Sequence, residues 1–212
     1  MSSALLLSNI AQVPVTFFDT ETTGLYPDCG DRIVEIAMVR TRAGQIEKTF
    51  DTLVYPDRAI PEDASRVSGI TDAMVWGKPR FQEIVDRICE MAEGSVLVAH
   101  NAPFDLGFLA VQFGEAQRPM LKNLVLDTLL LARRCYKLPD YSLGGLAKAL
   151  RVEKETFHRA LGDTVMTHRL FQQMAAVLRQ KKLNTVGHLV TFQGGSARPS
   201  IAQPRGAFLA SA

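Results

Sequence analysis

The sequence predicts an α/β fold in which a mixed β-sheet is flanked by helices, and three observations support this prediction. Short apolar segments with β-branched or aromatic residues follow one another closely in the first quarter of the chain. After Pro56, amphipathic helical patterns alternate with short buried-strand patterns. The last part of the main domain reads as helix alone. Strands followed by alternating helices and strands are typical of a sheet covered by helices.

The first three strands are expected to pair as antiparallel neighbours. Residues 15–18 are β-branched or aromatic and end at Asp19, which is typical of a short buried strand. Residues 33–41 predict a second strand. An Ala-Gly pair predicts a turn after it, and residues 46–55 predict a third strand. Strands this close in sequence have no room for the long crossover that a parallel pair requires.

The later elements alternate. Apolar residues at helical spacing predict a helix over 81–91, and Pro103 suits the first turn of a helix over 103–113. Residues 96–99 predict a fourth, buried strand, and residues 124–126 a fifth strand toward the edge of the sheet. Two further helices are expected over 143–150 and 159–178.

Composition restricts the class of protein. With 212 residues, 47% hydrophobic and 22% charged, the chain suits a globular domain. A net charge of only +2 argues against a passive, high-affinity DNA binder. Three scattered cysteines favour reduced thiols over a disulfide framework or a structural zinc site. The amino terminus is a poor signal peptide and no segment is long enough to span a membrane, so a cytoplasmic protein without a membrane partner is expected.

The chain is expected to have four regions. Residues 1–13 form an amino-terminal extension and residues 14–180 the main domain. Residues 181–193 form a helical extension, and residues 194–212, rich in Gly, Ala, Ser and Pro, form a flexible tail.

Acidic residues follow the first predicted strand. In an extended segment, residues two apart point to the same side, so Asp19 and Glu21 converge. Hard cations such as Mg²⁺ or Mn²⁺ prefer such oxygen ligands. An acid-x-acid pair is expected about twice by chance in a chain of this composition, so this pair alone is weak evidence.

Two further segments place an acid close to a histidine. The segment HNAPFD runs from His100 at a strand end to Asp105 in the first turn of a helix. The segment HRALGD runs from His158 to Asp163. Each segment, taken alone, also fits a carboxylate that stabilises the dipole at the start of a helix, beside a histidine on the surface. Four carboxylates and one histidine together are what a two-metal phosphodiesterase requires, because two ions stabilise the attacking and leaving oxygens and an imidazole accepts a proton.

The three segments DTETTGL, AHNAPFD and HRALGD, in this order, resemble the three motifs of the DEDDh 3′→5′ exonucleases. The likeness is to the epsilon (proofreading) type of bacterial DNA polymerase III and its free-standing relatives. It covers residues 14–178, which makes residues 14–180 an exonuclease domain. It implies a ribonuclease H-like fold with a five-stranded mixed sheet, and 3′→5′ hydrolysis of DNA in proofreading or repair.

The resemblance also implies a role for each motif residue. Asp19 would bridge two divalent ions, Mg²⁺ or Mn²⁺, while Glu21 and Asp163 would complete the site of the nucleophilic water. Asp105 would serve the second ion, and His158 would be the general base.

Substrate contacts are implied around these ligands. Backbone amides near Thr22, Thr23 and Gly24 would approach the terminal 3′-hydroxyl, since glycine permits close contact. Leu25 would wedge against the terminal base and Phe104 would offer a stacking face. His100 and Asn101 are expected in the same pocket.

Two alternatives remain at this point. The motifs do not encode the sugar, so an exoribonuclease is possible, although DTETTGL is more similar to the DNA-directed members. An inactive nucleic-acid-binding module would have lost a carboxylate or the histidine, and all five are present. A DNA polymerase or a sliding clamp is an implied partner. The short stretch after Gly194 departs from that pattern and favours a free-standing enzyme.

Two other charged or titratable residues are expected to be structural. Glu35 lies inside the second predicted strand and is interpreted as a paired internal carboxylate. His168 follows Asp163 by little more than one turn and is interpreted as a plain helix-face histidine.

Overall fold

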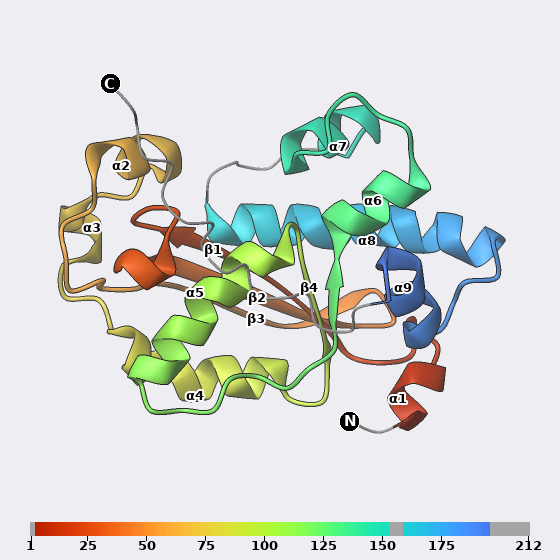
Figure 1. Cartoon of the computed structure of the whole chain (residues 1–212), viewed down its shortest axis with the longest axis horizontal. Helices are drawn as coiled ribbons and strands as arrows, with labels where there is room; N and C mark the ends of the chain where they lie inside the picture. The colour runs from red at the N-terminus through yellow and green to blue at the C-terminus, as the bar shows by residue number, and fades with distance from the viewer. Residues whose placement is uncertain (1–2, 153–158, 196–212) are drawn as a thin grey trace, which may run out of the picture.

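The computed structural model describes residues 3–152 and 159–195, and its centre is one five-stranded sheet (Figure 1). The strand order is β3-β2-β1-β4-β5. The strands are β1 (Val15–Thr22), β2 (Ile33–Arg42), β3 (Gln45–Leu53), β4 (Val96–Ala99) and β5 (Val125–Asp127). The predicted mixed sheet flanked by helices is confirmed.

Strand direction determines where the functional residues meet. β1, β2 and β3 pair antiparallel, whereas β1, β4 and β5 run parallel, and β5 is an edge strand as expected. The carboxyl ends of the three parallel strands therefore share one edge of the sheet. One boundary was predicted wrongly: β1 continues past Asp19 to Thr22, because the acidic segment remains paired with β2.

Helices cover both faces of the sheet (Figure 1). Phe18 packs in a core with α4 (Phe81–Ala92) and α5 (Ala102–Glu115). Its neighbour Phe17 points to the other face, where α6 (Thr128–Cys135), α7 (Leu143–Ala149), α8 (Ala160–Gln180) and α9 (Val186–Gln193) pack. Successive side chains of a strand point to opposite faces, so a sheet that is buried on both sides requires continuous apolar strands.

Several short helices had no clear signal in the sequence. They are α1 (Ser3–Leu7), the 3-10 turn η1 (Pro27–Cys29), α2 (Glu62–Ser68), α3 (Asp72–Val75) and α6. One or two turns carry too few apolar positions to define a helical period. Among the described residues, no helix combines the length and the apolar character that a membrane span requires.

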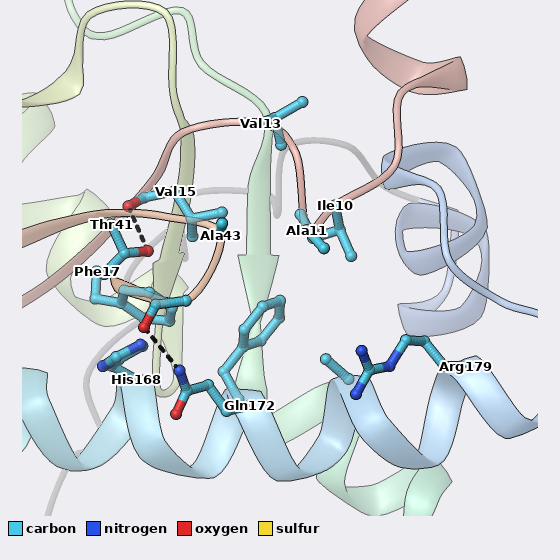
Figure 2. Close-up of a pocket in the computed structure, with 13 residues that line it drawn as sticks. Ile10, Ala11, Val13, Val15, Phe17, Thr41, Ala43, His168, Gln172 and Arg179 are labelled. Carbon is cyan, nitrogen blue, oxygen red and sulfur yellow. Dashed lines mark hydrogen bonds between the residues drawn. The ribbon is translucent and has the colours of Figure 1, made fainter. Parts of the chain in front are cut away.

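A cavity of about 290 Å³ lies at the end of the sheet where β1 begins (Figure 2). Its walls are mainly apolar and include Val15, Phe17 and Phe171. His168 also lines it, with its ring 4.9 Å from that of Phe17 and only 6% of the residue exposed. The interpretation of His168 as a plain helix-face histidine is corrected, because this face of α8 packs against the sheet.

Candidate active site

Three carboxylates meet at the carboxyl end of β1. Asp19 and Glu21 project from the strand, and Asp163 lies in the first turn of α8. One carboxylate oxygen of each lies within 4.8 Å of the others. The strand's two-residue period brings the first two together, and the start of α8 brings the third, which is separated by more than 140 positions in sequence.

The start of α8 is attached to the sheet by Glu35. Arg159 donates to Glu35 Oε1 from Nε at 3.0 Å and from Nη2 at 2.6 Å. The backbone N–H of Ala160 donates to Glu35 Oε2 at 2.8 Å. Glu35 is 1% exposed and lies opposite Glu21 across the strand pair. Its interpretation as a paired internal carboxylate is confirmed.

The fourth carboxylate is held differently. Asp105 lies in the first turn of α5 and is 3% exposed. Its Oδ1 accepts hydrogen bonds from Thr20, at 3.0 Å from the backbone N–H and 2.7 Å from the hydroxyl. It lies outside the group of three described carboxylates that could share one ion. The structure therefore places Asp105 beside β1, at a separate position from the other three ligand candidates.

The electrostatics of these residues have a common cause. Burial raises the pKa of Asp19 well above its usual range, and the charges of Asp105 and Asp163 raise it further. Burial and then the Asp163 charge raise the pKa of Glu21 to about 7. Burial raises the pKa of Asp105 to about 7, although the hydrogen bond from Thr20 acts in the opposite direction. Like charges in a desolvated site disfavour ionisation unless a cation compensates them.

The carboxylate cluster fits a divalent metal ion. Its donors are oxygens, which Mg²⁺ and Mn²⁺ prefer. Burial raises the pKa of Asp19, Glu21 and Asp105, and neighbouring carboxylates raise the pKa of Asp19 and Glu21 further. Bound cations would reverse this penalty, because they favour the ionised carboxylates.

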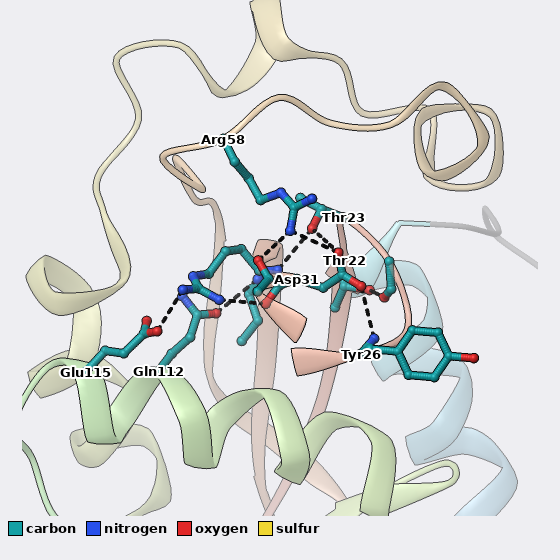
Figure 3. A network of polar contacts seen from close by, with 11 residues as sticks. Thr22, Thr23, Tyr26, Asp31, Arg58, Gln112 and Glu115 are labelled. Carbon is teal, nitrogen blue, oxygen red and sulfur yellow. Dashed lines mark hydrogen bonds and ion pairs between the residues drawn. The ribbon is translucent and has the colours of Figure 1, made fainter. Parts of the chain in front are cut away.

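The DTETTGL turn is fixed by Asp31 (Figure 3). Thr23 donates to Asp31 Oδ1 at 3.2 Å and the N–H of Tyr26 donates to Oδ2 at 3.0 Å. A Cβ on Gly24 would lie 2.2 Å from Asp31 Oδ2, so this position requires glycine. Thr22 donates its hydroxyl to the Gly24 carbonyl at 2.6 Å. The side chains of Thr22 and Thr23 thus stabilise the turn itself.

Two apolar side chains flank this turn and the start of α5. Leu25, expected to wedge against a base, is 66% exposed at the tip of the turn. Phe104, expected to stack, is half-buried and packs against Phe108 with ring centroids 5.1 Å apart. Leu25 is therefore free to contact a ligand, whereas only part of the Phe104 ring is accessible.

His100 and Asn101 connect β4 to α5. His100 Nδ1 lies 3.0 Å from Thr128 Oγ1, and burial lowers the pKa of the ring to about 4, so it is neutral near pH 7. Asn101 adopts a left-handed conformation with φ of 63° and caps α5. Its N–H donates to Asp127 Oδ1 at 3.1 Å, which fixes the turn that leads into Asp105.

The structure adds residues that the motifs did not indicate. Thr20 binds Asp105, Asp31 shapes the turn around Gly24, and Asp127 fixes Asn101. Thr20 and Gly24 lie inside a motif, but Asp31 and Asp127 lie outside all three motifs and carry no pattern of their own. His158, expected to be the general base, lies outside the described residues.

Comparison with known proteins identifies the family. The exonuclease family profile RNase_T matches residues 16–171. A Treponema pallidum protein named DNA polymerase III subunit epsilon is 39% identical over 83% of this chain and 83% of its own length. A Rhodobacter capsulatus epsilon-like protein is 42% identical over 89% of this chain, which spans only 27% of that relative.

A solved structure agrees with these relatives. Exonuclease X in complex with 5′-overhanging duplex DNA superimposes with a TM-score of 0.66 and 31% identity, covering 85% of this chain and 99% of that one. Fold, motif order and sequence similarity therefore agree: the chain belongs to the exonuclease family, in its epsilon-like, DEDDh group.

Proposed function

We propose that this protein is a 3′→5′ exonuclease that removes nucleoside 5′-monophosphates from DNA ends in proofreading or repair. The observation that carries the proposal is the meeting of Asp19, Glu21 and Asp163 within 4.8 Å at the carboxyl end of β1. A cluster of this kind suits phosphodiester hydrolysis, since metal ions bound there supply a Lewis acid and an activated water.

The carboxylates divide into two groups in this proposal. Asp19, Glu21 and Asp163 hold one divalent ion, Mg²⁺ or Mn²⁺. Asp105, whose charge raises the pKa of Asp19, would serve a second ion together with Asp19. Thr20 orients Asp105 through two hydrogen bonds, so the carboxylate is preorganised for this role.

The remaining residues position the strand and move the proton. Leu25 is exposed in the turn that follows β1 and is available to pack against the terminal base. Backbone amides of the turn at Gly24 approach the 3′-hydroxyl, and Phe104 offers the accessible part of its ring. His158 accepts the proton from the attacking water, since imidazole is the side chain best matched to this task near neutral pH.

DNA is the proposed substrate class rather than RNA. Relatives named as DNA polymerase III subunits and the exonuclease X complex with duplex DNA support this choice. An exoribonuclease uses the same carboxylate chemistry, so only the sugar distinguishes the two. A DNA polymerase is the proposed partner if the protein acts in proofreading, as the name of the Treponema relative suggests.

The test is a degradation assay on three labelled oligonucleotides of one sequence. They are single-stranded DNA, duplex DNA with a 3′ mismatch, and single-stranded RNA. We expect stepwise shortening of both DNA substrates from the 3′ end with Mg²⁺ or Mn²⁺, and no shortening with EDTA. Ca²⁺ should not support turnover, because its looser geometry holds the reacting oxygens poorly.

Each contrary result has a separate meaning. Full activity after exhaustive chelation would overturn the metal mechanism. Faster shortening of RNA than of DNA would overturn the substrate assignment while leaving the chemistry in place. Release of products from the 5′ end would overturn the direction of hydrolysis.

A further inference from the structure

A groove lies beside the carboxylate cluster, at the same edge of the sheet. It has a volume of about 540 Å³, and its lining includes His100, Asn101, Arg133 and Tyr141. We call it the α6–α7 groove, since most of its lining comes from α6, the start of α7 and the loop between them. Figure 1 shows α6 and α7 on the side of the sheet that also holds α8.

Strand geometry gives the distance of this groove from the cluster. His100 follows β4, whereas α6 follows β5. Both strands run parallel to β1 in the order β1-β4-β5. Neighbouring strands lie about 4.8 Å apart, so the end of β5 is about 10 Å from the end of β1. Nucleotides rise by about 3.4 Å or more along a strand, so this distance corresponds to about two or three nucleotides.

The chain that forms the groove is basic, and the lining itself contains one cation, Arg133, and one acid, Asp140. From the start of α6 to residue 152 the chain has five basic residues and one acidic residue, a net charge of +4, although the whole chain has only +2. The basic residues are Arg133, Arg134, Lys137, Lys148 and Arg151. The single acid, Asp140, accepts hydrogen bonds from the N–H and hydroxyl of Ser142, at 2.8 and 2.9 Å. This stretch of the chain is thus more basic than the sequence as a whole, and Arg133 is the member of it that lines the groove.

Arg133 is held ready for a ligand. Its guanidinium lies over the ring of Tyr141, with Cζ 5.9 Å from the centroid. Tyr141 is itself fixed, because its hydroxyl donates to the Tyr136 carbonyl at 3.0 Å and accepts from the N–H of Leu138 at 3.1 Å. Arg133 is exposed, and an exposed guanidinium stacked on a rigid ring retains donors for a phosphate.

We propose that the α6–α7 groove binds the phosphate backbone of the substrate strand about two or three nucleotides to the 5′ side of the hydrolysed bond. Arg133 is the phosphate contact and Tyr141 positions it. This inference rests on the proposed nuclease function and extends it to the path of the strand away from the active site.

The experiment compares Arg133→Gln with Arg179→Gln in the full chain. Arg179 is also exposed, but it lies in the last turn of α8 and lines the cavity at the opposite end of the sheet. The two substitutions therefore remove the same charge from opposite ends of the molecule. Affinity for a single-stranded DNA 12-mer is measured in Ca²⁺ at several salt concentrations. Turnover in Mn²⁺ is measured on the 12-mer and on the p-nitrophenyl ester of thymidine 5′-phosphate, which has no upstream nucleotide.

Arg133→Gln should weaken 12-mer binding about tenfold and lower the slope of log Kd against log salt by about 0.7, the value for one phosphate contact on a single strand. Its hydrolysis of the nitrophenyl ester should equal that of the unmodified protein. Arg179→Gln should leave all three measurements unchanged. Tyr141→Leu should weaken binding less, and adding it to Arg133→Gln should have no further effect, since it acts through Arg133.

The contrary outcomes separate this proposal from the function itself. Equal effects of Arg133→Gln and Arg179→Gln, or no effect of either on affinity, would overturn the groove as a strand-binding site. So would a loss that is the same on the 12-mer and on the nitrophenyl ester. Tight 12-mer binding that depends on Arg133, without hydrolysis of either substrate, would leave the groove standing and overturn the nuclease function.

Discussion

The two ends of β1 both bury titratable groups, yet they differ in what the burial does. At the carboxyl end, burial and neighbouring carboxylates raise the pKa of Asp19 and Glu21. At the amino end, burial lowers the pKa of His168 beside an apolar cavity (Figure 2). A lone buried imidazole avoids the penalty by remaining neutral. Four neighbouring carboxylates cannot all be ionised near neutral pH without this cost, so only the carboxyl end requires cations to stabilise its charged form.

The comparison explains why a cavity alone does not mark the functional site. The cavity at the amino end is lined mainly by apolar side chains. The carboxyl end brings charged groups from three segments together. Chemistry requires the second arrangement, because reacting atoms are stabilised by convergent charge.

The roles of the two ends of β1 can be tested by removing one titratable side chain from each end. Asp19→Ala should reduce turnover on single-stranded DNA by about 10³-fold or more, since it would remove the ligand shared by both proposed metal ions. His168→Leu should leave turnover within about twofold of the unmodified protein, because the imidazole packs against Phe17 and lines the apolar cavity. Initial rates in saturating Mn²⁺ measure both effects.

The stability of the metal-free Asp19→Ala variant should not fall with its turnover. Asp19→Ala removes one of several repelling carboxylates, so the metal-free variant should be at least as stable as the unmodified protein. Thermal denaturation in EDTA is the control that separates lost chemistry from lost folding. Near-normal turnover by folded Asp19→Ala protein, or strong loss with His168→Leu, would reverse the assignment of the two ends.

The second prediction concerns the attachment of α8 to the carboxyl end. Arg159→Ala should lower the free energy of unfolding by about 2 to 3 kcal/mol, because it leaves the buried Glu35 carboxylate with the Ala160 N–H but without its guanidinium. Glu35→Gln should cost less, about 1 to 2 kcal/mol, since an amide oxygen still accepts from Ala160 and Arg159 is partly exposed. Urea denaturation of the two single variants and the double variant measures this.

The double variant is the decisive comparison. Its loss of stability should be clearly smaller than the sum of the two single losses, because both act on one ion pair. Mn²⁺ affinity should fall in both single variants, since Asp163 depends on the position of the first turn of α8. Additive losses of stability with unchanged Mn²⁺ affinity would show that the pair does not position the site.

The sequence was sufficient to predict the sheet and the convergence of Asp19 and Glu21. Strand periodicity predicted the five strands, and the spacing of Asp19 and Glu21 predicted their shared direction. The partners of Asp105 and Arg159 were not predictable, because Thr20 and Glu35 are separated from them by 85 and 124 positions. Contacts between segments so distant in sequence depend on the packing of the whole fold and leave no local pattern.

Glycine 24 shows the same limit at a single residue. Its place in the turn after Asp19 and Glu21 suggested close approach to the terminal 3′-hydroxyl. The structure adds an internal reason, since the carboxylate of Asp31 occupies the space of a Cβ. Both reasons predict glycine, so the residue type alone does not distinguish them.

The smallest expected effect is the pH dependence of metal-free stability. Glu21 and Asp105 have pKa values of about 7 in the folded protein, against ordinary values of 4.5 and 3.8. Between about pH 4 and about pH 7 the folded state therefore binds more protons than the unfolded state. Stability contributed by these groups is complete below about pH 4 and is lost as the pH rises through about 7. The chelated protein should thus become less stable from about pH 5 to about pH 8.

The size of this pH dependence follows from the pKa shifts of Glu21 and Asp105. One pKa unit corresponds to about 1.4 kcal/mol, and mutual coupling of the carboxylates reduces the sum, so we expect about 1 to 3 kcal/mol, or about 2 to 10 °C in Tm.

Saturating Mg²⁺ should flatten or reverse the trend, because the ions favour the ionised carboxylates of the folded state. Asp19→Ala should reduce the slope in EDTA, whereas His168→Leu should not remove the decline, since burial lowers the pKa of His168 and its own contribution to stability therefore rises with pH. Thermal denaturation at several pH values, with EDTA and with Mg²⁺, gives the comparison. A chelated protein whose Tm rises steadily from about pH 5 to about pH 8 would mean that the carboxylates are already compensated by the protein itself, and the carboxyl end of β1 would then need no cation.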